Sequence, residues 1–250
     1  MNPARLELLW DPPPARRQLT GTDIHVWAAA LRQSAEPISS LESTLSTEEC
    51  ERAKKFHFER DRNRFIIVRG ILRALLGSYV TVAPEKLKFA YGPNGKPVLA
   101  DMPGPDTLHF NLAHSGDLMV IALTRAGAIG IDVEQVRLMH DTENIAARFF
   151  SSNEATKLKA LSKGQQTEAF FNLWTRKEAC LKAMGEGLSD EMIRQIEATF
   201  LPGEAPRVVA ISGNAQTAAS WTLKEFVPAT GFVVAIAAKA KDLKFSCWQW

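Results

Sequence analysis

The sequence predicts an α+β fold in which helices and small antiparallel sheets are present in similar proportion. Three observations lead to this prediction. Strand-like runs occur in the middle and near the end of the chain, amphipathic helical stretches flank them, and no repeat of fixed period is visible. The 250 residues are 46% hydrophobic and 23% charged, which is the profile of a globular protein with a substantial core.

The N-terminal part is predicted to form an irregular arm, a strand and two helices. Pro12, Pro13 and Pro14 are incompatible with a helix or a central strand, so residues 1–20 are assigned to the arm. Acidic residues placed just after a capping residue then favour the start of a helix. The expected elements are a strand at 24–31, a helix capped by Ser46 or Thr47, and a helix over 59–76 that ends at Gly77.

The middle of the chain is predicted to form an antiparallel meander. Apolar and polar residues alternate over 108–113, and turn-forming residues at 114–117 and 126–127 separate this run from two further strands at 118–124 and 128–134. The C-terminal part is expected to contain helices at 142–149, from Ser151 and at 165–184 up to Gly185, then strands at 198–201, 220–227 and 232–238. The chain is accordingly divided into halves at 21–133 and 134–250.

Composition excludes several classes of protein. Three scattered cysteines form neither a disulfide framework nor a zinc motif, which favours a reducing, cytoplasmic location. No apolar stretch is long enough for a membrane span, and the proline-broken N-terminus does not resemble a signal peptide. The net charge of +2 gives no indication of nucleic-acid binding, although eight Lys or Arg residues against two acids over 52–73 favour an anionic ligand or an acidic partner.

The segment 129–134 carries the first candidate site. On a strand its apolar residues share one face, while Gly130, Asp132 and Glu134 share the other. The two carboxylates would then lie about 7 Å apart, and their repulsion favours a cation between them, such as Mg²⁺. Two solvated acids at a strand end would give the same pattern, and the D-x-E spacing is common.

The long helix over 165–184 carries a second set of charged residues. Glu178 falls on its apolar stripe, between Trp174 and Leu181, where a carboxylate needs a partner. Lys182, one turn later, could form an i,i+4 salt bridge with it. Alternatively, Glu178 is a third metal ligand and Lys182 contacts a phosphate. The spacing alone supports both interpretations.

Other basic residues are weaker candidates. His114 closes a strand just before a turn, where phosphate contacts collect, although a structural histidine is more common there. The turn at 92–97 presents Lys96, for which a solvated loop tip is the simpler interpretation. Arg69 lies beside the apolar stripe of its helix and is the most interesting of the arginines in that region.

Taken together, these segments resemble the Sfp-type 4′-phosphopantetheinyl transferases. The resemblance is carried by FNLAHSG at 110–116, GIDVE at 130–134 and WTRKEACLK at 174–182, with supporting pieces GKP at 95–97, FFS at 149–151 and RAKKFHFERD at 52–61. No single piece is specific, but they occur in the order typical of the family, from 52 to about 188.

The resemblance implies a fold, a reaction and a set of roles. The fold would be two similar α/β halves related by a pseudo-twofold, each a small antiparallel sheet packed with helices. The protein would be a cytoplasmic monomer that moves the 4′-phosphopantetheine group of coenzyme A (CoA) to a serine of an acyl or peptidyl carrier protein and releases 3′,5′-ADP. Mg²⁺, for which Mn²⁺ could substitute, would be the metal, and neither nucleic acid nor a membrane would be a partner.

By similarity, the site residues fall into three groups. Asp132, Glu134 and Glu178 match the metal-binding acids, and Glu178 also matches the base proposed for the serine. Lys182 matches the lysine that stabilises the leaving group, and is placed with Glu178 and Asp132 in the catalytic set. The CoA-binding positions are Arg52, Arg69, Lys96, Ala113, His114, Asp132 and Lys182. Ala113 departs from the family, which commonly has serine there, and this predicts a weaker grip on phosphate.

Three alternatives compete with this hypothesis. A metal-dependent transferase or hydrolase acting on another diphosphate would have similar acids and lysines, but would need no acceptor protein. A non-catalytic module could bind CoA or a carrier protein with the same fold. A structural interaction protein would carry these acids as surface groups, and CoA would not change its thermal stability.

Overall fold

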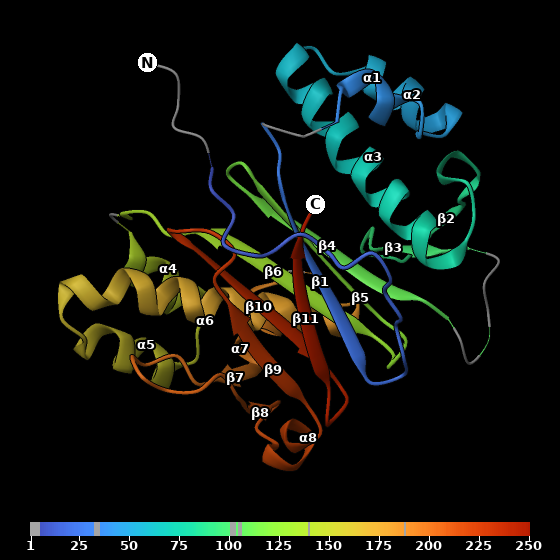
Figure 1. Ribbon diagram of the computed structural model, residues 1–250. Coiled ribbons are helices and arrows are strands. Elements are labelled where there is room, and N and C mark those ends of the chain that lie inside the picture. Colours follow the sequence, from blue (N-terminus) through green and yellow to red (C-terminus); the bar gives the residue numbers. More distant parts are fainter. Residues whose placement is uncertain (1–5, 33–35, 101–103, 105–106, 140, 188) are drawn as a thin grey trace.

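The protein is built in four layers, helix, sheet, sheet and helix (Figure 1). The computed structural model describes residues 6–32, 36–100, 104, 107–139, 141–187 and 189–250. One sheet packs against α3 (Glu59–Val80), the other packs against α6 (Lys163–Met184), and the two sheets pack face to face. The mixture of helices and small, mainly antiparallel sheets agrees with the predicted α+β class.

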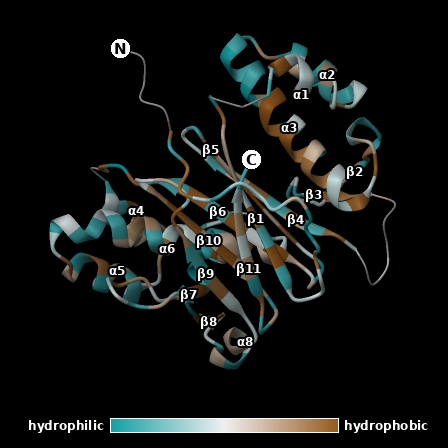
Figure 2. Ribbon diagram, viewed as in Figure 1, coloured by the Kyte–Doolittle hydropathy of each residue, from teal (hydrophilic) through white to brown (hydrophobic). Residues whose placement is uncertain are grey.

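The first sheet has the strand order β11-β1-β5-β4, with β1 at Asp23–Ala30, β4 at His109–Ser115, β5 at Leu118–Thr124 and β11 at Lys244–Gln249. The pairings β1–β5 and β4–β5 are antiparallel, whereas β1–β11 is parallel. Hydrophobic residues concentrate in α3 and the central strands (Figure 2). Beside α3 lie α1 (Ile38–Glu42), α2 (Thr47–Lys54), the 3₁₀ turn η1 (Pro84–Lys86) and the hairpin of β2 (Phe89–Tyr91) and β3 (Pro97–Leu99).

The second sheet has the order β6-β10-β9, with β6 at Ile129–Gln135, β9 at Thr222–Phe226 and β10 at Phe232–Ala238, all antiparallel. Its outer face is covered by α6. Around α6 lie α4 (Thr142–Phe149), α5 (Ser152–Ala160), α7 (Asp190–Arg194) and α8 (Ala215–Ala219), together with the short pair of β7 (Ile196–Ala198) and β8 (Val208–Ile211).

The two sheets meet along a seam between β4 and β6. No main-chain hydrogen bond joins these two strands, both of which are described throughout. Side chains of β4 bond the main chain of β6 instead: Asn111 Oδ1 accepts from the Ile131 N–H at 2.8 Å, and Ser115 Oγ accepts from the Gln135 N–H at 3.1 Å. Buried unpaired amides are costly, so these two bonds stabilise the seam.

The prediction that the third strand of the meander pairs with the second is wrong. Residues 129–135 form a strand, but it pairs with β10 and not with β5. Both edges of β5 are already occupied, by β1 and β4, so no edge is left for β6. The expected division at 133/134 therefore falls inside β6, and β11 returns from the end of the chain to the first sheet.

Most of the predicted helix ends are confirmed, although α6 begins at Lys163 and not at 165. Ser46 and Ser151 each form a capping box, with Glu49 and Glu154 respectively, and Gly185 ends α6 in the left-handed region. In contrast, α3 continues past Gly77 to Val80. A side chain at Gly77 would overlap the Val82 carbonyl oxygen, so the glycine permits the following turn to fold back onto the helix.

The arm is irregular over its described part, as expected, and it crosses both sheets. The Leu9 N–H donates to the Pro228 carbonyl, and the Gln249 N–H donates to the Asp11 carbonyl. The Trp10 ring meets Phe226 edge to face at a centroid distance of 6.1 Å. Within the described residues, no helix has the length and apolar character that crossing a bilayer requires.

Candidate active site

Strand β6 presents two chemically different faces, as its alternation predicts. Ile129, Ile131 and Val133 are buried in the core between the sheets. Asp132 lies on the opposite face, against α6, and is 6% exposed. This placement leaves a carboxylate between a strand and a helix, where solvation is poor and partners are needed.

The partner of Asp132 is Lys182. The Lys182 Nζ lies 2.6 Å from Asp132 Oδ1, while Asp132 Oδ2 is buried without a hydrogen-bond partner within the described structure. Burial raises the pKa of Asp132 to about 7; Lys182 opposes that rise, and the carboxylates of Glu178 and Glu134 add to it. The site thus contains an orphaned carboxylate oxygen in an environment with an excess of negative charge.

Glu178 projects from α6 toward the same region and is half-buried. Burial raises its pKa; Lys182 lowers it, and the negative charge of Glu134 raises it further. The i,i+4 salt bridge between Glu178 and Lys182 is wrong as an expectation, because the lysine turns across to Asp132 in the structure. Glu178 is therefore a partly buried carboxylate with an elevated proton affinity.

Glu134 lies at the end of β6, where the seam opens to solvent. Its Oε2 accepts a hydrogen bond of 2.8 Å from Ser115 Oγ on β4, and Arg137 Nη1 lies 3.7 Å from the same oxygen. The glutamate thus accepts a hydrogen bond from the neighbouring sheet and also lies near an exposed arginine.

A glycine brings the strand and the helix together. A methyl group on Gly130 would overlap the Ala179 carbonyl oxygen and the Ala183 nitrogen of α6. Only glycine allows this approach, and the small side chains of the two alanines complete the contact. The close packing of β6 on α6 is what permits Lys182 to reach Asp132.

His114 is an exposed residue near the end of β4. Its Nδ1 lies 3.3 Å from Arg64 Nη2 of α3. Partial burial lowers the pKa of His114, and the nearby cations of Arg64 and Lys182 lower it further. Arg64 also lies 4.0 Å from Asp117, which Arg32 contacts at 2.9 Å. Basic side chains of the first half therefore gather around Asp117 and the end of β4.

Lys96 is not the solvated loop tip that the simpler interpretation expected. Its turn exists, between β2 and β3, but its Nζ donates to the carbonyl oxygens of Ile129 at 2.8 Å and Lys182 at 2.6 Å. Burial and the Lys182 charge lower the pKa of Lys96 to about 8. The lysine ties the first half to the start of β6 and the end of α6.

Three of the expected CoA-binding residues have other surroundings. Arg69 is buried and bonds Glu49 and the Tyr91 hydroxyl, beside Arg73, which also contacts Glu49. Arg52 is exposed, with its guanidinium 5.3 Å from the centre of the Phe65 ring. Ala113 is buried in the core between the sheets. Contacts of these residues with CoA remain predictions.

The donor set suits a hard divalent cation, but it is not assembled as a closed metal site. Within the described part of the chain, no three His, Cys, Asp or Glu side chains converge in a geometry that could hold a metal ion. The charges of Glu178 and Glu134 help to raise the pKa of Asp132, the charge of Glu134 helps to raise that of Glu178, and Asp132 Oδ2 has no hydrogen-bond partner among the described residues. Carboxylate oxygens are the ligands that Mg²⁺ prefers, so these residues fit such an ion once Lys182 moves from Asp132.

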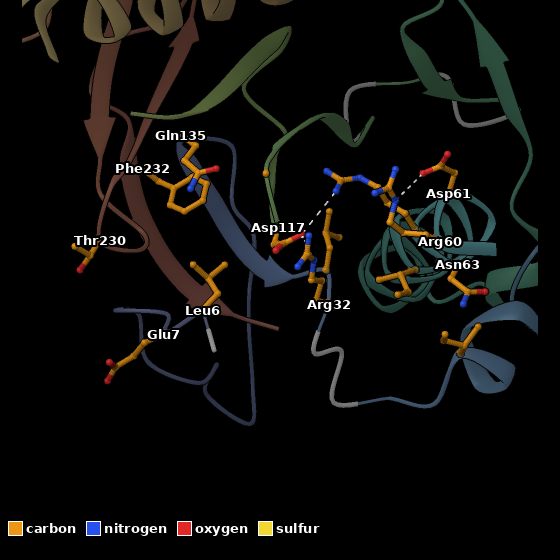
Figure 3. Close-up of a pocket in the computed structure, with 15 residues that line it drawn as sticks. Leu6, Glu7, Arg32, Arg60, Asp61, Asn63, Asp117, Gln135, Thr230 and Phe232 are labelled. Carbon is orange, nitrogen blue, oxygen red and sulfur yellow. Dashed lines mark hydrogen bonds and ion pairs between the residues drawn. The ribbon is translucent and has the colours of Figure 1, made fainter. Parts of the chain in front are cut away.

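A cavity of about 950 Å³ opens where the seam ends (Figure 3). Gly116 and Gln135, which directly follow Ser115 and Glu134, form part of its wall. Leu6 and Glu7 of the arm and Phe232 of β10 line one side of it, and Arg32, Arg60 and Arg64 line the other. The cavity is therefore bounded by both halves and by the arm.

Comparison with known proteins shows to which family the chain belongs. The family model for the 4′-phosphopantetheinyl transferase superfamily matches residues 128–237, and the model for the 4′-phosphopantetheinyl transferase N-terminal region matches 30–126. The 4′-phosphopantetheinyl transferase HetI of Nostoc sp. is 37% identical over 245 residues, which cover 98% of this chain and 100% of that protein. The chain belongs to the 4′-phosphopantetheinyl transferase family.

Two further similarities accompany this assignment. The 4′-phosphopantetheinyl transferase Sfp of Bacillus subtilis is 32% identical over 156 residues, which cover 62% of this transferase and 67% of Sfp. A crystal structure of the holo-[acyl-carrier-protein] synthase of Thermotoga maritima is similar over 44% of this chain and 61% of the synthase chain. The sequence identity is 22% and the TM-score is 0.34.

Sequence reasoning on this transferase missed the polar residues of the seam. Asn111 and Ser115 lie within FNLAHSG and Arg64 lies within the basic segment 52–73, but none of the three was assigned a role. The available signal was the period of two: Asn111, Ala113 and Ser115 share one side of a strand. These residues face β6, and the meander prediction placed that strand wrongly, so their contacts could not be predicted.

Proposed function

We propose that this transferase moves the 4′-phosphopantetheine group of CoA to a serine of an apo carrier protein in a magnesium-dependent reaction that releases 3′,5′-ADP. The observation that carries the proposal is the half-satisfied Asp132, buried between β6 and α6 and flanked by Lys182, Glu178 and Glu134. Such a set of acids with one lysine suits a metal–diphosphate ligand, which supplies both the cation and the anion that the residues need.

Asp132, Glu134 and Glu178 would hold the metal. When bound, Mg²⁺ supplies positive charge to the diphosphate and favours departure of the leaving group. Lys182, released from Asp132, would contact the diphosphate. Arg64 would add positive charge for the phosphates, and the His114 beside it would contribute a hydrogen bond. Electrostatic stabilisation of this kind is the main contribution that a protein makes to phosphoryl transfer.

Glu178 would act as the general base. The serine oxygen of the carrier forms a bond to the phosphorus that bears the pantetheine arm, and the bond from that phosphorus to the bridging oxygen breaks. The serine proton passes to Glu178, and the bridging oxygen leaves with 3′,5′-ADP. A carboxylate whose pKa is raised by burial is a better proton acceptor than an exposed one.

The cavity at the end of the seam would receive the pantetheine arm. Its wall contains Gln135, which follows Glu134, and Gly116, which follows Ser115. A pantetheine arm that extends away from the acids would therefore enter the cavity directly. Arg32, Arg60 and Arg64 on its rim would face the carrier protein, since carrier domains are typically acidic. Basic residues there would speed association more than they strengthen the complex.

We further infer that the two sheet-and-helix layers are halves related by a pseudo-twofold. Each has a long helix on the outer face of a small sheet, and the seam lies between them. The free, scattered cysteines support a cytoplasmic location for the reaction.

The test is intact-mass spectrometry of a panel of apo carrier proteins incubated with the transferase, CoA and Mg²⁺. We expect a mass gain of one phosphopantetheine group that disappears when EDTA is added. Asp132→Ala and Glu178→Gln should each lower the rate of transfer at least about 100-fold while leaving thermal unfolding near that of the wild type. Glu143→Gln removes an exposed carboxylate paired with Lys163 and serves as the matched control with normal transfer.

Three results would contradict the proposal in different ways. Full activity in Asp132→Ala or Glu178→Gln would show that the site is elsewhere. CoA binding without transfer to any carrier would favour the non-catalytic module. Hydrolysis of CoA without an acceptor protein would point to a diphosphate hydrolase.

A further inference from the structure

Ser115 and Glu134 meet across the seam although they belong to different sheets. Ser115 is the last residue of β4, and its Oγ lies 2.8 Å from Glu134 Oε2 and 3.1 Å from the Gln135 nitrogen. The main-chain N–H can only donate, so it occupies a lone pair of the serine oxygen. The single hydroxyl proton is then available to Glu134, which makes this a charge-assisted hydrogen bond of fixed direction.

Other charged groups also act on the carboxylate of Glu134. Arg137 Nη1 lies 3.7 Å from the same Oε2, on a side chain that is 60% exposed, at the outer rim of the site. Asp132 and Glu178 are also carboxylates, and the charge of Glu134 helps to raise the pKa of both, so the three groups repel one another when ionised. Without the serine hydroxyl, we expect the carboxylate to turn outward to Arg137.

From this geometry we propose that Ser115 is a positioning residue for Glu134, whose carboxylate it holds toward Asp132 and the metal. The inference rests on the proposed function, since it gives Glu134 its task there. Ser115 itself touches neither metal nor CoA. It acts through the orientation of one acid, as outer-shell partners of metal ligands commonly do.

Asn111 shows that the seam itself does not depend on this bond. Its Oδ1 accepts the Ile131 N–H at 2.8 Å, four residues earlier on both strands, and is buried. Loss of Ser115 Oγ leaves this second link in place. A change in metal affinity that exceeds the change in stability would therefore separate positioning from seam structure.

The experiment measures Mn²⁺ binding by electron paramagnetic resonance in the full chain without CoA, alongside kcat and KM for CoA. Ser115→Ala should weaken Mn²⁺ binding roughly tenfold and lower kcat more than it raises KM. Ser115→Thr keeps the hydroxyl and should restore both. The matched control is Thr124→Val. Thr124 Oγ1 also donates to one group, the Asp23 carbonyl of the neighbouring strand β1, and accepts from one N–H, that of Ala126 in the turn after β5.

Thermal unfolding of the variants completes the test. Equal Mn²⁺ affinity in Ser115→Ala and the wild type overturns the inference and leaves the proposed function intact. Equal loss of Mn²⁺ affinity in Ser115→Ala and Thr124→Val also overturns it, because a general loosening would then be the cause. A wild-type protein that neither binds Mn²⁺ nor modifies a carrier overturns the inference together with the proposed function.

Discussion

Lys96 joins the turn between β2 and β3 to the main chain of β6 and α6. Its ammonium is half-buried and donates to the carbonyls of Ile129 and Lys182, so it fixes the position of the lysine that pairs with Asp132. Burial and the Lys182 charge lower the pKa of Lys96 to about 8. The sequence predicted a turn with a lysine, but a turn pattern does not say which distant main chain the lysine reaches.

The lowered pKa of Lys96 has a consequence for stability. In the unfolded chain lysine binds its proton up to about pH 10.4, whereas in the folded protein Lys96 loses it near pH 8. Between these values the unfolded state binds more protons, so the contribution of Lys96 to the free energy of unfolding rises with pH. We expect the free energy of unfolding of Lys96→Met to lack this rise. In the wild type the rise should be on the order of 1 kcal/mol between about pH 7.5 and about pH 10.

Urea denaturation of the two proteins across that pH range measures the difference. Lys244→Met is the control, because Lys244 is an exposed residue of β11 and the same charge is removed. Parallel stability curves for Lys96→Met and the wild type would show that Lys96 remains charged and solvated.

At the scale of the element, β6 was predicted in its extent and its two faces but not in its neighbours. Ile129, Ile131 and Val133 face the core, and Asp132 faces α6, as a period of two requires. The pairing with β10 could not be predicted, because strand partners depend on which edges other strands have already taken. The shared cation of the carboxylates stays a prediction, and in this structure Asp132 pairs with Lys182.

Gly130 sets the distance between β6 and α6, and its replacement tests that contact. We expect Gly130→Ala to destabilise the protein by about 1–3 kcal/mol, since the methyl group has no room against the helix main chain. Transfer activity should fall as well, because Lys182 and Glu178 move away from Asp132.

Gly164→Ala is the control for that prediction. Nothing lies within 4 Å of a methyl group at Gly164, in the first turn of α6, so alanine there should be neutral or stabilising by up to about 1 kcal/mol. Thermal unfolding followed by circular dichroism compares the two. A Gly130→Ala protein as stable as Gly164→Ala would mean that α6 packs less closely than described.

At the scale of the whole molecule, β11 closes the first sheet from the far end of the chain. It runs parallel to β1, and the rings of Trp248 and Trp250 pack near Trp27 at centroid distances of 5.4 and 6.2 Å. The strand was not predicted from the sequence, because its partner lies more than 200 residues earlier.

Removal of residues 244–250 would expose the edge of β1 and the Trp27 side chain. We expect a lower Tm, association through the exposed edge, and faster hydrogen exchange in β1 than in β10. Hydrogen exchange followed by mass spectrometry, with Trp250→Ala as the milder comparison, measures this. Equal exchange in both strands would show that the two sheets unfold as one unit.

The seam between β4 and β6 also bears on how such a site changes over evolutionary time. A main-chain ladder is made from groups that nearly every residue carries, so single substitutions rarely remove it. The bonds of the seam are made by the side chains of Asn111 and Ser115, and one mutation is enough to delete or replace either. The spacing between the two sheets, and with it the spacing of the acids, is therefore a heritable trait that point mutations can tune without dismantling either sheet.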